Sequence, residues 1–372
     1  MTAPTALNWY VTLTQELEIA GQRGTRLAVV DAEALAQLRR VAVAEQETAA
    51  TALTAHAEVL AAREELELAA RAAEVAAALG RFATARAGQD LLPAIESDLA
   101  QAEVARLSLL QAEAQARSSA AQTMWSLLVA AGEGSAVDSP PASSVATAPA
   151  ASAETLHSMS SARAAGRLDD ILPLTPQAEV PTLAQRLPRA LQLRADFVAA
   201  QHEQVLRRAQ VTLLRRARIP NVTLSFMAQN DGFNERVLGA GISLPLPLPE
   251  PLGPTRAGDI GAADRAVDQA AAQIEKLRRQ VQSELERAIA AVETTRRALQ
   301  QVPTDLIGRA NADLGAIAAA LTQGRLPLRE ALMWQRGLID LLQLHVRARR
   351  NHALARIELQ RASGLPLLRV QP

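Results

Sequence analysis

The sequence predicts a mainly α-helical protein with very long antiparallel coiled-coil helical hairpins in two repeats, accompanied by short β-strands. Three observations lead to this fold class. Hydrophobic residues make up 49% of the chain but aromatic residues only 2%, whereas compact globular cores usually contain large aromatic side chains. Alanine, leucine, arginine, glutamate and glutamine, which favour helices, dominate the composition. Long stretches repeat apolar residues every three or four positions, the spacing of packed helices.

Composition and motifs exclude several classes of protein. The 372 residues include no cysteine, which excludes disulfide scaffolds, thiolate zinc sites and cysteine nucleophiles. Basic and acidic residues number 39 each, which argues against a nucleic-acid binder. No Gly-rich phosphate loop follows a strand, and no Ser-His-Asp order lies in a strand–turn–helix context, so we expect no enzyme, no catalytic residue and no cofactor. The sequence contains no apolar run of about 18 residues, so it predicts no transmembrane helix. Short membrane strands that alternate apolar and polar residues would not be detected in this way.

The first repeat is predicted at residues 1–132. Its first element alternates between apolar and polar side chains, with Trp9, Val11 and Leu13 on one face, which is typical of a strand. Gly88 lies in the turn between two long helices. The predicted elements are a strand over 8–14, a helix from about 25 to 79 and a helix from about 92 to 130.

Residues 133–181 form a predicted Pro/Ser/Ala-rich linker, with one short helix near 153–166. The second repeat is predicted at 182–372 and contains a helix, a β-hairpin and a long helical hairpin. Its elements are a helix over 182–217, strands over 221–227 and 237–244, a helix from about 258 to 322 with disturbances at Pro303, Gly308 and Gly315, and a helix over 328–363.

Two apolar seams step by three or four residues along the second repeat, close to the 3.5-residue period of coiled coils. The first seam consists of Val267, Ala270, Ile274, Leu277, Val281, Leu285, Ala288 and Val292. The second consists of Leu338, Leu341, His345, Ala348, His352, Ala355 and Leu359. The two histidines lie about 10 Å apart along a helix, too far to share one metal ion, so we expect no metal site.

The order of these segments resembles the TolC-like outer-membrane efflux proteins, in particular the heavy-metal and cation efflux members. The similarity extends over nearly the whole chain, and no single motif decides it. The segments that carry it are Gln15–Gly24 after the first strand, Arg218–Leu224 at the helix-to-strand entry, Leu244–Leu248 at the strand-to-helix exit, Gly324 at the hairpin turn and Glu330–Leu332 after it.

The resemblance implies a homotrimer in the outer membrane of a Gram-negative bacterium, with a periplasmic extension. Each protomer would supply four strands to a twelve-stranded transmembrane β-barrel, and the hairpins would form a periplasmic tunnel. The implied partners are a periplasmic adaptor (membrane fusion) protein, an inner-membrane pump and outer-membrane lipid. The implied function is a passive conduit of a tripartite efflux system for metal cations or drugs. Trp9 and Tyr10 suit either an interfacial aromatic belt or ordinary strand packing.

The sequence departs from the family pattern in three ways. The family's signal peptide, first helix and first strand have no counterpart before Trp9, so we expect an N-terminally truncated chain or a misplaced start. The family's lipidated cysteine is absent. The family carries an acidic residue six positions after each turn glycine. Glu330 has this position after Gly324, but Ala94 has it after Gly88, which predicts a thinner acidic ring.

The resemblance and the local pattern together suggest five candidate site residues. Glu330 is the pore or gate candidate, because three carboxylates around a three-fold axis would favour cations. The alternative is a solvated glutamate stabilised by the helix dipole. The candidates for contact with the adaptor are Gly88, Gly324, Arg325 and Leu326. The alternative for both glycines is a plain helix C-cap.

Three other functions remain open from the sequence. A type I secretion conduit would have the same fold and differ in its pump. A soluble coiled-coil scaffold would leave the alternating segments outside any membrane. A non-functional fragment would lack a strand that the barrel needs. Identification of the partner pump and cell fractionation distinguish these alternatives.

Overall fold

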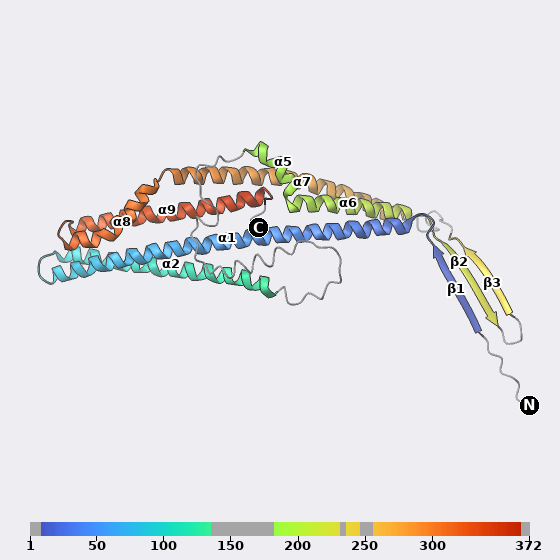
Figure 1. Cartoon of the computed structure of the whole chain (residues 1–372), viewed down its shortest axis with the longest axis horizontal. Coiled ribbons are helices and arrows are strands. Elements are labelled where there is room, and N and C mark those ends of the chain that lie inside the picture. The colour runs from blue at the N-terminus through green and yellow to red at the C-terminus, as the bar shows by residue number, and fades with distance from the viewer. Residues whose placement is uncertain (1–8, 135–181, 231–235, 246–255, 366–372) are drawn as a thin grey trace, which may run out of the picture. The chain divides into compact units, whose positions relative to one another are not determined.

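A computed structural model describes residues 9–134, 182–230, 236–245 and 256–365 (Figure 1). The chain divides into two compact units. In the described part of the chain, no helix combines the length and the apolar character needed to cross a membrane. The sheet unit comprises Met1–Val43 and Arg194–Gln280, and the hairpin unit comprises Ala44–Leu193 and Val281–Pro372.

Three antiparallel strands form the described sheet of the sheet unit, in the order β1–β2–β3. The predicted strands are confirmed, but β1 continues into the segment that was expected to follow it. Its last residue, Leu17, pairs with Val222, so the partner strand still supplies backbone hydrogen bonds there. The connection between the two strands of the predicted hairpin, residues 231–235, lies outside the described residues. The strands are β1 (Trp9–Leu17), β2 (Val222–Asn230) and β3 (Arg236–Ser243).

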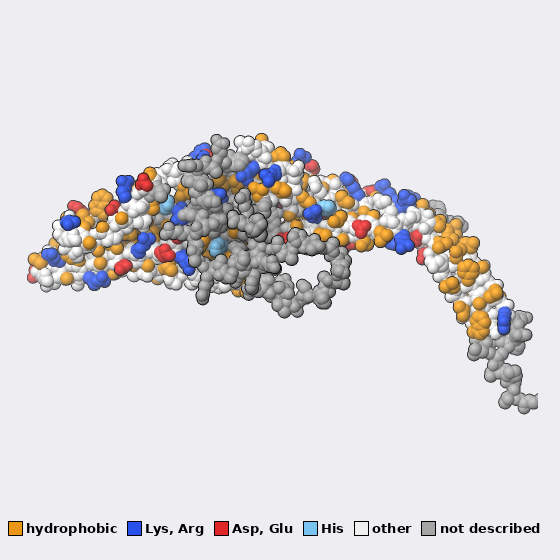
Figure 2. Space-filling model, viewed as in Figure 1, with side chains coloured by type: hydrophobic (Ala, Val, Ile, Leu, Met, Phe, Trp, Pro, Cys, Tyr) orange, Lys and Arg blue, Asp and Glu red, His pale blue; other side chains and the backbone are white. Residues whose placement is uncertain are grey.

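The strand register gives the sheet two chemically different faces. The cross-strand row Leu13–Phe226–Ala240 is apolar, whereas the next pair, Thr14 and Ser225, is polar. Hydrophobic side chains gather over the strands in the space-filling view (Figure 2). The apolar residues on the first face are Trp9, Val11, Leu13, Leu17, Val222, Leu224, Phe226, Ala228, Leu238, Ala240 and Ile242.

Helix α1 (Gln22–Ala87) begins three residues earlier than predicted, so Gly24 lies inside the helix. Gly21 turns the chain with a left-handed φ of 72°. The side chain of Gln22 is 4% exposed and makes two hydrogen bonds. Its Oε1 accepts the N–H of Ala20 at 3.0 Å, and its Nε2 donates to the carbonyl of Ile219 at 2.9 Å. This side chain therefore joins the end of β1 to the chain that enters β2.

The single helix predicted over 182–217 is wrong, because the chain forms α5 (Leu183–Leu193) and then α6 (Ala195–Arg216). Arg194 between them is extended, with φ −67° and ψ 121°. Its guanidinium pairs with the carboxylate of Asp196 at 2.6 Å, and the other oxygen of Asp196 accepts the N–H of Phe197 at 2.8 Å. These bonds stabilise a new helix start without any glycine or proline.

The hairpin unit contains the later part of α1 and of α7 (Ala257–Gln300), together with α2, α5, α8 and α9. The predicted helix over 258–322 divides at Pro303, which is extended, and continues through Gly308 and Gly315. Helix α2 ends two residues inside the predicted linker, and the predicted helix at 153–166 lies outside the described residues. The remaining helices are α2 (Ala94–Gly134), α8 (Thr304–Thr322) and α9 (Leu328–Ala362).

Small and aliphatic side chains fill the main core of the hairpin unit. Alanine rows on α1 allow close helix packing, and Leu79 is fully buried among them. The first predicted seam is confirmed as buried from Val281 onward. In α9 the most buried row lies one position beyond the predicted seam, at Ile339 and Leu342 rather than Leu338 and Leu341.

Candidate functional site

The turn between α8 and α9 is a tight glycine turn. Gly324 has a left-handed φ of 70°, which favours glycine. The N–H of Gly324 donates to the carbonyl of Leu321, and the N–H of Arg325 donates to the carbonyl of Ala320, both at 3.0 Å. This pair of bonds is the Schellman pattern that ends a helix. Pro327 then caps α9 with φ −64° and ψ 149°.

The candidate residues of this turn differ in exposure. Leu326 is half-buried and packs against the main core, next to Leu328, which is 4% exposed. Arg325 and Glu330 are exposed to solvent. Glu330 lies in the first turn of α9, where the helix dipole stabilises a carboxylate. The turn thus presents Arg325, Arg329 and Glu330 at its surface and anchors itself through leucines.

The turn between α1 and α2 has the same hydrogen-bond pattern around a different residue. The left-handed residue is Asp90, with φ 56°, and not Gly88. The N–H of Asp90 donates to the carbonyl of Ala87 at 3.1 Å, and the N–H of Leu91 donates to that of Arg86 at 3.0 Å. A Cβ on Gly88 would lie 3.5 Å from the nearest atom, an ordinary contact. The local geometry therefore does not require glycine at Gly88.

This geometry corrects the alignment of the two turns by two residues. Asp90, not Gly88, corresponds to Gly324, and Pro93 then corresponds to Pro327. The counterpart of Glu330 becomes Glu96, in the first turn of α2, instead of Ala94. Both turns therefore carry a glutamate, and the expectation of an acidic residue in the second repeat alone is wrong. Sequence reasoning missed Glu96 because it took the nearest glycine as the turn position.

The two hairpins are also linked by a buried carboxylate. Glu103 of α2 is 3% exposed and accepts hydrogen bonds from Arg106 of the same helix and from Arg336 of α9, the latter at 2.7 Å. Burial raises the pKa of Glu103, but the hydrogen bonds from both guanidiniums outweigh it and hold the pKa below its ordinary value. Glu103 therefore remains charged and joins the two hairpins.

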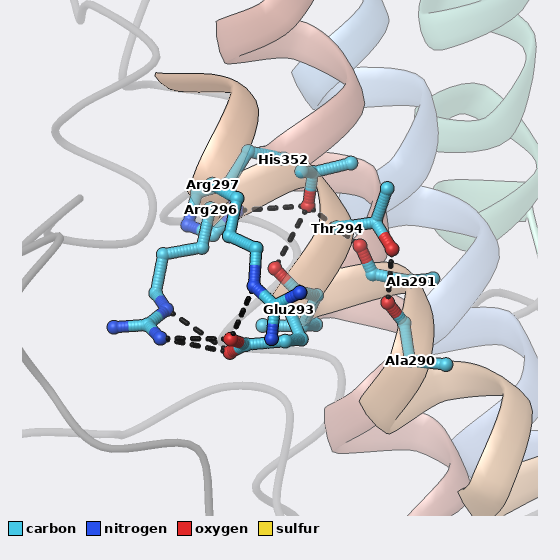
Figure 3. A network of polar contacts seen from close by, with 9 residues as sticks. Ala290, Ala291, Glu293, Thr294, Arg296, Arg297 and His352 are labelled. Atoms are coloured by element: carbon cyan, nitrogen blue, oxygen red, sulfur yellow. Dashed lines mark hydrogen bonds and ion pairs between the residues drawn. The ribbon is translucent and has the colours of Figure 1, made fainter. Parts of the chain in front are cut away.

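Of the two seam histidines, His352 is buried and His345 is half-buried. His352 is 3% exposed, and its Nδ1 lies 3.0 Å from Oγ1 of Thr295 (Figure 3). The Thr295 hydroxyl also lies 2.8 Å from the carbonyl of Ala291, and which group donates between Thr295 and His352 depends on the tautomer of the imidazole. Burial and the charges of Arg356 and Arg296 lower the pKa of His352. Among the described residues, no cluster of three metal-ligating side chains occurs.

Comparison with known proteins identifies similar solved structures. No family model matches the sequence, and no curated protein matches it. The chain is similar to the outer membrane protein VceC of Vibrio cholerae, with 17% identity over 97% of this chain and 80% of that chain and a TM-score of 0.63. It is similar to the MtrE outer membrane channel of Neisseria gonorrhoeae, with 16% identity over 98% and 81% and a TM-score of 0.68. It is also similar to the CmeC outer membrane channel of Campylobacter jejuni, with 12% identity over 96% and 71% and a TM-score of 0.68.

At these identities the similarity defines a fold. The three matches extend over 96–98% of this chain, so the similarity includes both its long helices and its sheet. The chain has the fold of the TolC-like outer-membrane channels, as the resemblance in its sequence predicts.

Proposed function

We propose that the chain is the outer-membrane channel component of a tripartite efflux system, a passive conduit across the outer membrane and the periplasm. The observation that carries this proposal is the two-faced sheet attached to long helical hairpins, in the fold of solved outer-membrane channels. An inner-membrane pump supplies the energy in this proposal, and a periplasmic adaptor joins the pump to the channel. Metal cations or drugs are the proposed cargo.

The sheet supports a position in the membrane. Its strands are eight or nine residues long, close to the 9–11 residues that span a bilayer when tilted. On the apolar face Leu13, Leu238 and Ile242 are 66%, 84% and 77% exposed. Lipid would cover these side chains, whereas the face with Thr14 and Ser225 would line water.

The edges of the sheet support assembly. Within the described residues, β1 and β3 each have one edge without a partner strand. A sheet edge in lipid leaves backbone groups unsatisfied, so the edges must join other strands in a closed barrel. We propose a homotrimer whose chains share one transmembrane β-barrel. The twelve strands implied by the resemblance would require one more strand per chain than the described residues contain.

The first part of α1 supports the same assembly. Four apolar side chains there are exposed although they follow a helical spacing, and one copy of the chain leaves them uncovered. Neighbouring protomers would bury them as a coiled-coil seam. These side chains are Leu27, Val30, Leu38 and Val41, with exposed fractions of 58%, 59%, 60% and 55%.

We propose that residues of the two hairpin turns form the gate and contact the periplasmic adaptor. Glu330, repeated by the three-fold axis, would form a carboxylate ring that favours cations. Gly88, Gly324, Arg325 and Leu326 would contact the adaptor. The exposed guanidinium of Arg325 and the half-buried side chain of Leu326 give this contact one charged and one apolar element.

Cell fractionation tests the proposed function. The gene is expressed with its upstream reading frame, membranes are separated, and the mass is measured in detergent. We expect the protein in the outer-membrane fraction, released only by detergent, with the mass of three chains. A monomer in detergent-free buffer would support the coiled-coil scaffold instead. A pump gene of the secretion type beside this gene would favour the type I secretion conduit.

A further inference from the structure

A row of exposed apolar side chains follows the first turns of α2. Ile95 and Leu99 are 76% and 48% exposed, and Ala102 continues the row in an exposed position. The steps of four and three residues are those of a coiled-coil seam. Helix α2 packs into the main core of the hairpin unit with a different row, which contains Ala100 and Leu107. The described part of one chain therefore leaves a second apolar seam of α2 exposed.

Helix α8 presents a flat surface of small residues. Its buried row, which includes Ala310 and Leu314, packs into the main core. On its exposed side, a Cβ added to Gly308 or Gly315 would meet no atom within 4 Å, so the space above this side is open. The exposed row of α8 consists of Gly308, Ala312, Gly315 and Ala319.

The two rows lie at matching levels above the hairpin turns. Asp90 and Gly324 hold the equivalent left-handed positions in these turns. Glu103 and Arg336 follow them by 13 and 12 residues, and their side chains meet at 2.7 Å, so similar counts correspond to similar heights on α2 and α9. Three pairs of positions in the exposed rows have equal counts from the turns: Ile95 and Ala319 with five residues, Leu99 and Gly315 with nine, and Ala102 and Ala312 with twelve.

The charges beside the two rows are complementary near the turns. On α2, residues 91–102 contain Glu96 and Asp98 and no basic residue. On α8, residues 314–323 carry no charge, and the exposed Arg325 and Arg329 follow, with Glu330 as the one carboxylate beside them. Opposite charges of this kind fix the register of two surfaces more than they add affinity.

We infer that the exposed row of α2 packs against the exposed row of α8 in a second copy of the chain, with Leu99 over Gly315. This inference rests on the proposed homotrimer. A three-fold axis along the helices keeps every copy at the same level, so positions with equal counts meet. The contact joins two different faces, and its repetition around the axis closes a ring. Glycine and alanine let the two helices approach closely, and the leucine fills the space that the absent Cβ leaves.

Disulfide cross-linking tests this contact, because the chain contains no cysteine of its own. Leu99→Cys and Gly315→Cys are made in separate chains, which are co-expressed with the upstream reading frame, solubilised in detergent and oxidised. Both positions are exposed, so we expect both variants to fold. We expect a reducible species with the mass of two chains, and none when either variant is expressed alone, because a disulfide needs Cα atoms within about 7 Å.

A matched control and a second pair make the result decisive. Leu109→Cys lies on the same side of α2, ten residues or about 15 Å beyond Leu99, and should not cross-link to Gly315→Cys. The pair Ile95→Cys and Ala319→Cys should cross-link as the first pair does.

The mass of the unoxidised complex in detergent is measured on the same samples. Three chains that cross-link at neither pair, or that cross-link equally well through Leu109→Cys, would overturn the inference and leave the proposed channel intact. Single chains would overturn both.

Discussion

Helix α1 buries its apolar side chains very differently in the two units. In the sheet unit Leu27 and Leu38 are 58% and 60% exposed, whereas in the hairpin unit Leu60 and Leu79 are 1% and 0% exposed. The residue types are the same, so the difference lies in the neighbours that each unit supplies. The hairpin unit fills its own core from α1, α2, α8 and α9. The sheet unit leaves one helix seam and one sheet face uncovered, and the proposed trimer and lipid would cover them.

The largest expected effect is the loss of stability when a leucine is truncated in the core of the hairpin unit. The same truncation in the sheet unit should have little effect. Leu79→Ala removes a fully buried side chain, so we expect the free energy of unfolding of the hairpin unit to fall by about 2–5 kcal/mol. Leu38→Ala should change the unfolding of a single chain by about 0.5 kcal/mol or less, because the side chain is exposed there. Denaturant unfolding of both variants, followed by circular dichroism, measures the contrast. Equal losses would show that the seam at Leu38 is already buried within one chain.

Removal of the ionic link between the two hairpins should have the next largest effect on stability. Glu103→Gln removes a buried carboxylate from two guanidiniums, and we expect a loss of about 1–2 kcal/mol at neutral pH, because both arginines are partly exposed. The folded pKa of Glu103 is depressed, so its stabilisation is present above the ordinary value of 4.5 and is lost as the pH falls through the folded pKa.

Unfolding of the wild type and Glu103→Gln between pH 7 and pH 3 measures this effect. The exposed Glu113→Gln on the same helix is the matched control, and we expect it to behave as the wild type at every pH. A difference between wild type and Glu103→Gln that persists unchanged at the lowest pH would argue against a charged link.

Mild acid should weaken the hairpin unit through its buried histidine. Burial and then the charges of Arg356 and Arg296 depress the pKa of His352 below 6.5, so the unfolded chain binds more protons in this range. Stability is therefore full above pH 6.5 and declines as the pH falls below that value. The guanidinium of Arg296 pairs with the carboxylate of Glu293 at 2.9 Å, which offsets part of its charge (Figure 3).

The variant His352→Gln separates this histidine from the other titrating groups. We expect its unfolding midpoint to depend less on pH between 7 and 5 than that of the wild type. The matched control is His202→Gln in the sheet unit, where we expect the wild-type pH dependence. An identical pH profile for His352→Gln and the wild type would contradict the role of His352.

Substitutions in the two turns should have the smallest effects, and these should differ in size. Gly324→Ala places a Cβ at a left-handed φ of 70°, and we expect a loss of about 1 kcal/mol. Asp90→Gly relieves the same strain at φ 56° but also loosens the unfolded chain, so we expect a change within about 0.5 kcal/mol. Thermal unfolding of both variants measures this difference. A large loss in Asp90→Gly would indicate that the Asp90 side chain itself stabilises the turn.

The sequence predicts elements well where one signal dominates. Strict alternation around Val11 and Leu224 predicted the strands. Of the three disturbances predicted in the helix over 258–322, only the one at Pro303 breaks the helix. The break at Arg194 escaped prediction, because it depends on a side-chain contact with Asp196 and not on a breaker residue. The first part of the seam on α9 was misplaced by one position, because both Leu338 and Ile339 begin apolar rows with helical spacing, whereas its later positions His352 and Leu359 are buried as predicted.

The candidate site was predictable only in part. Glu330 follows a glycine turn and was identified, whereas its counterpart Glu96 follows a turn in which aspartate takes the left-handed position. The carboxylate of Glu103 was missed, because long-range pairing with Arg336 leaves no spacing signal in the sequence.

The mass of the detergent-solubilised protein from outer membranes tests the central claim most directly. The proposed homotrimer predicts three chains in one complex, and the exposed seam of α1 predicts that Leu38→Asp shifts the complex towards single chains. A single chain of 39.6 kDa that remains stable and monodisperse without detergent would contradict the proposed channel.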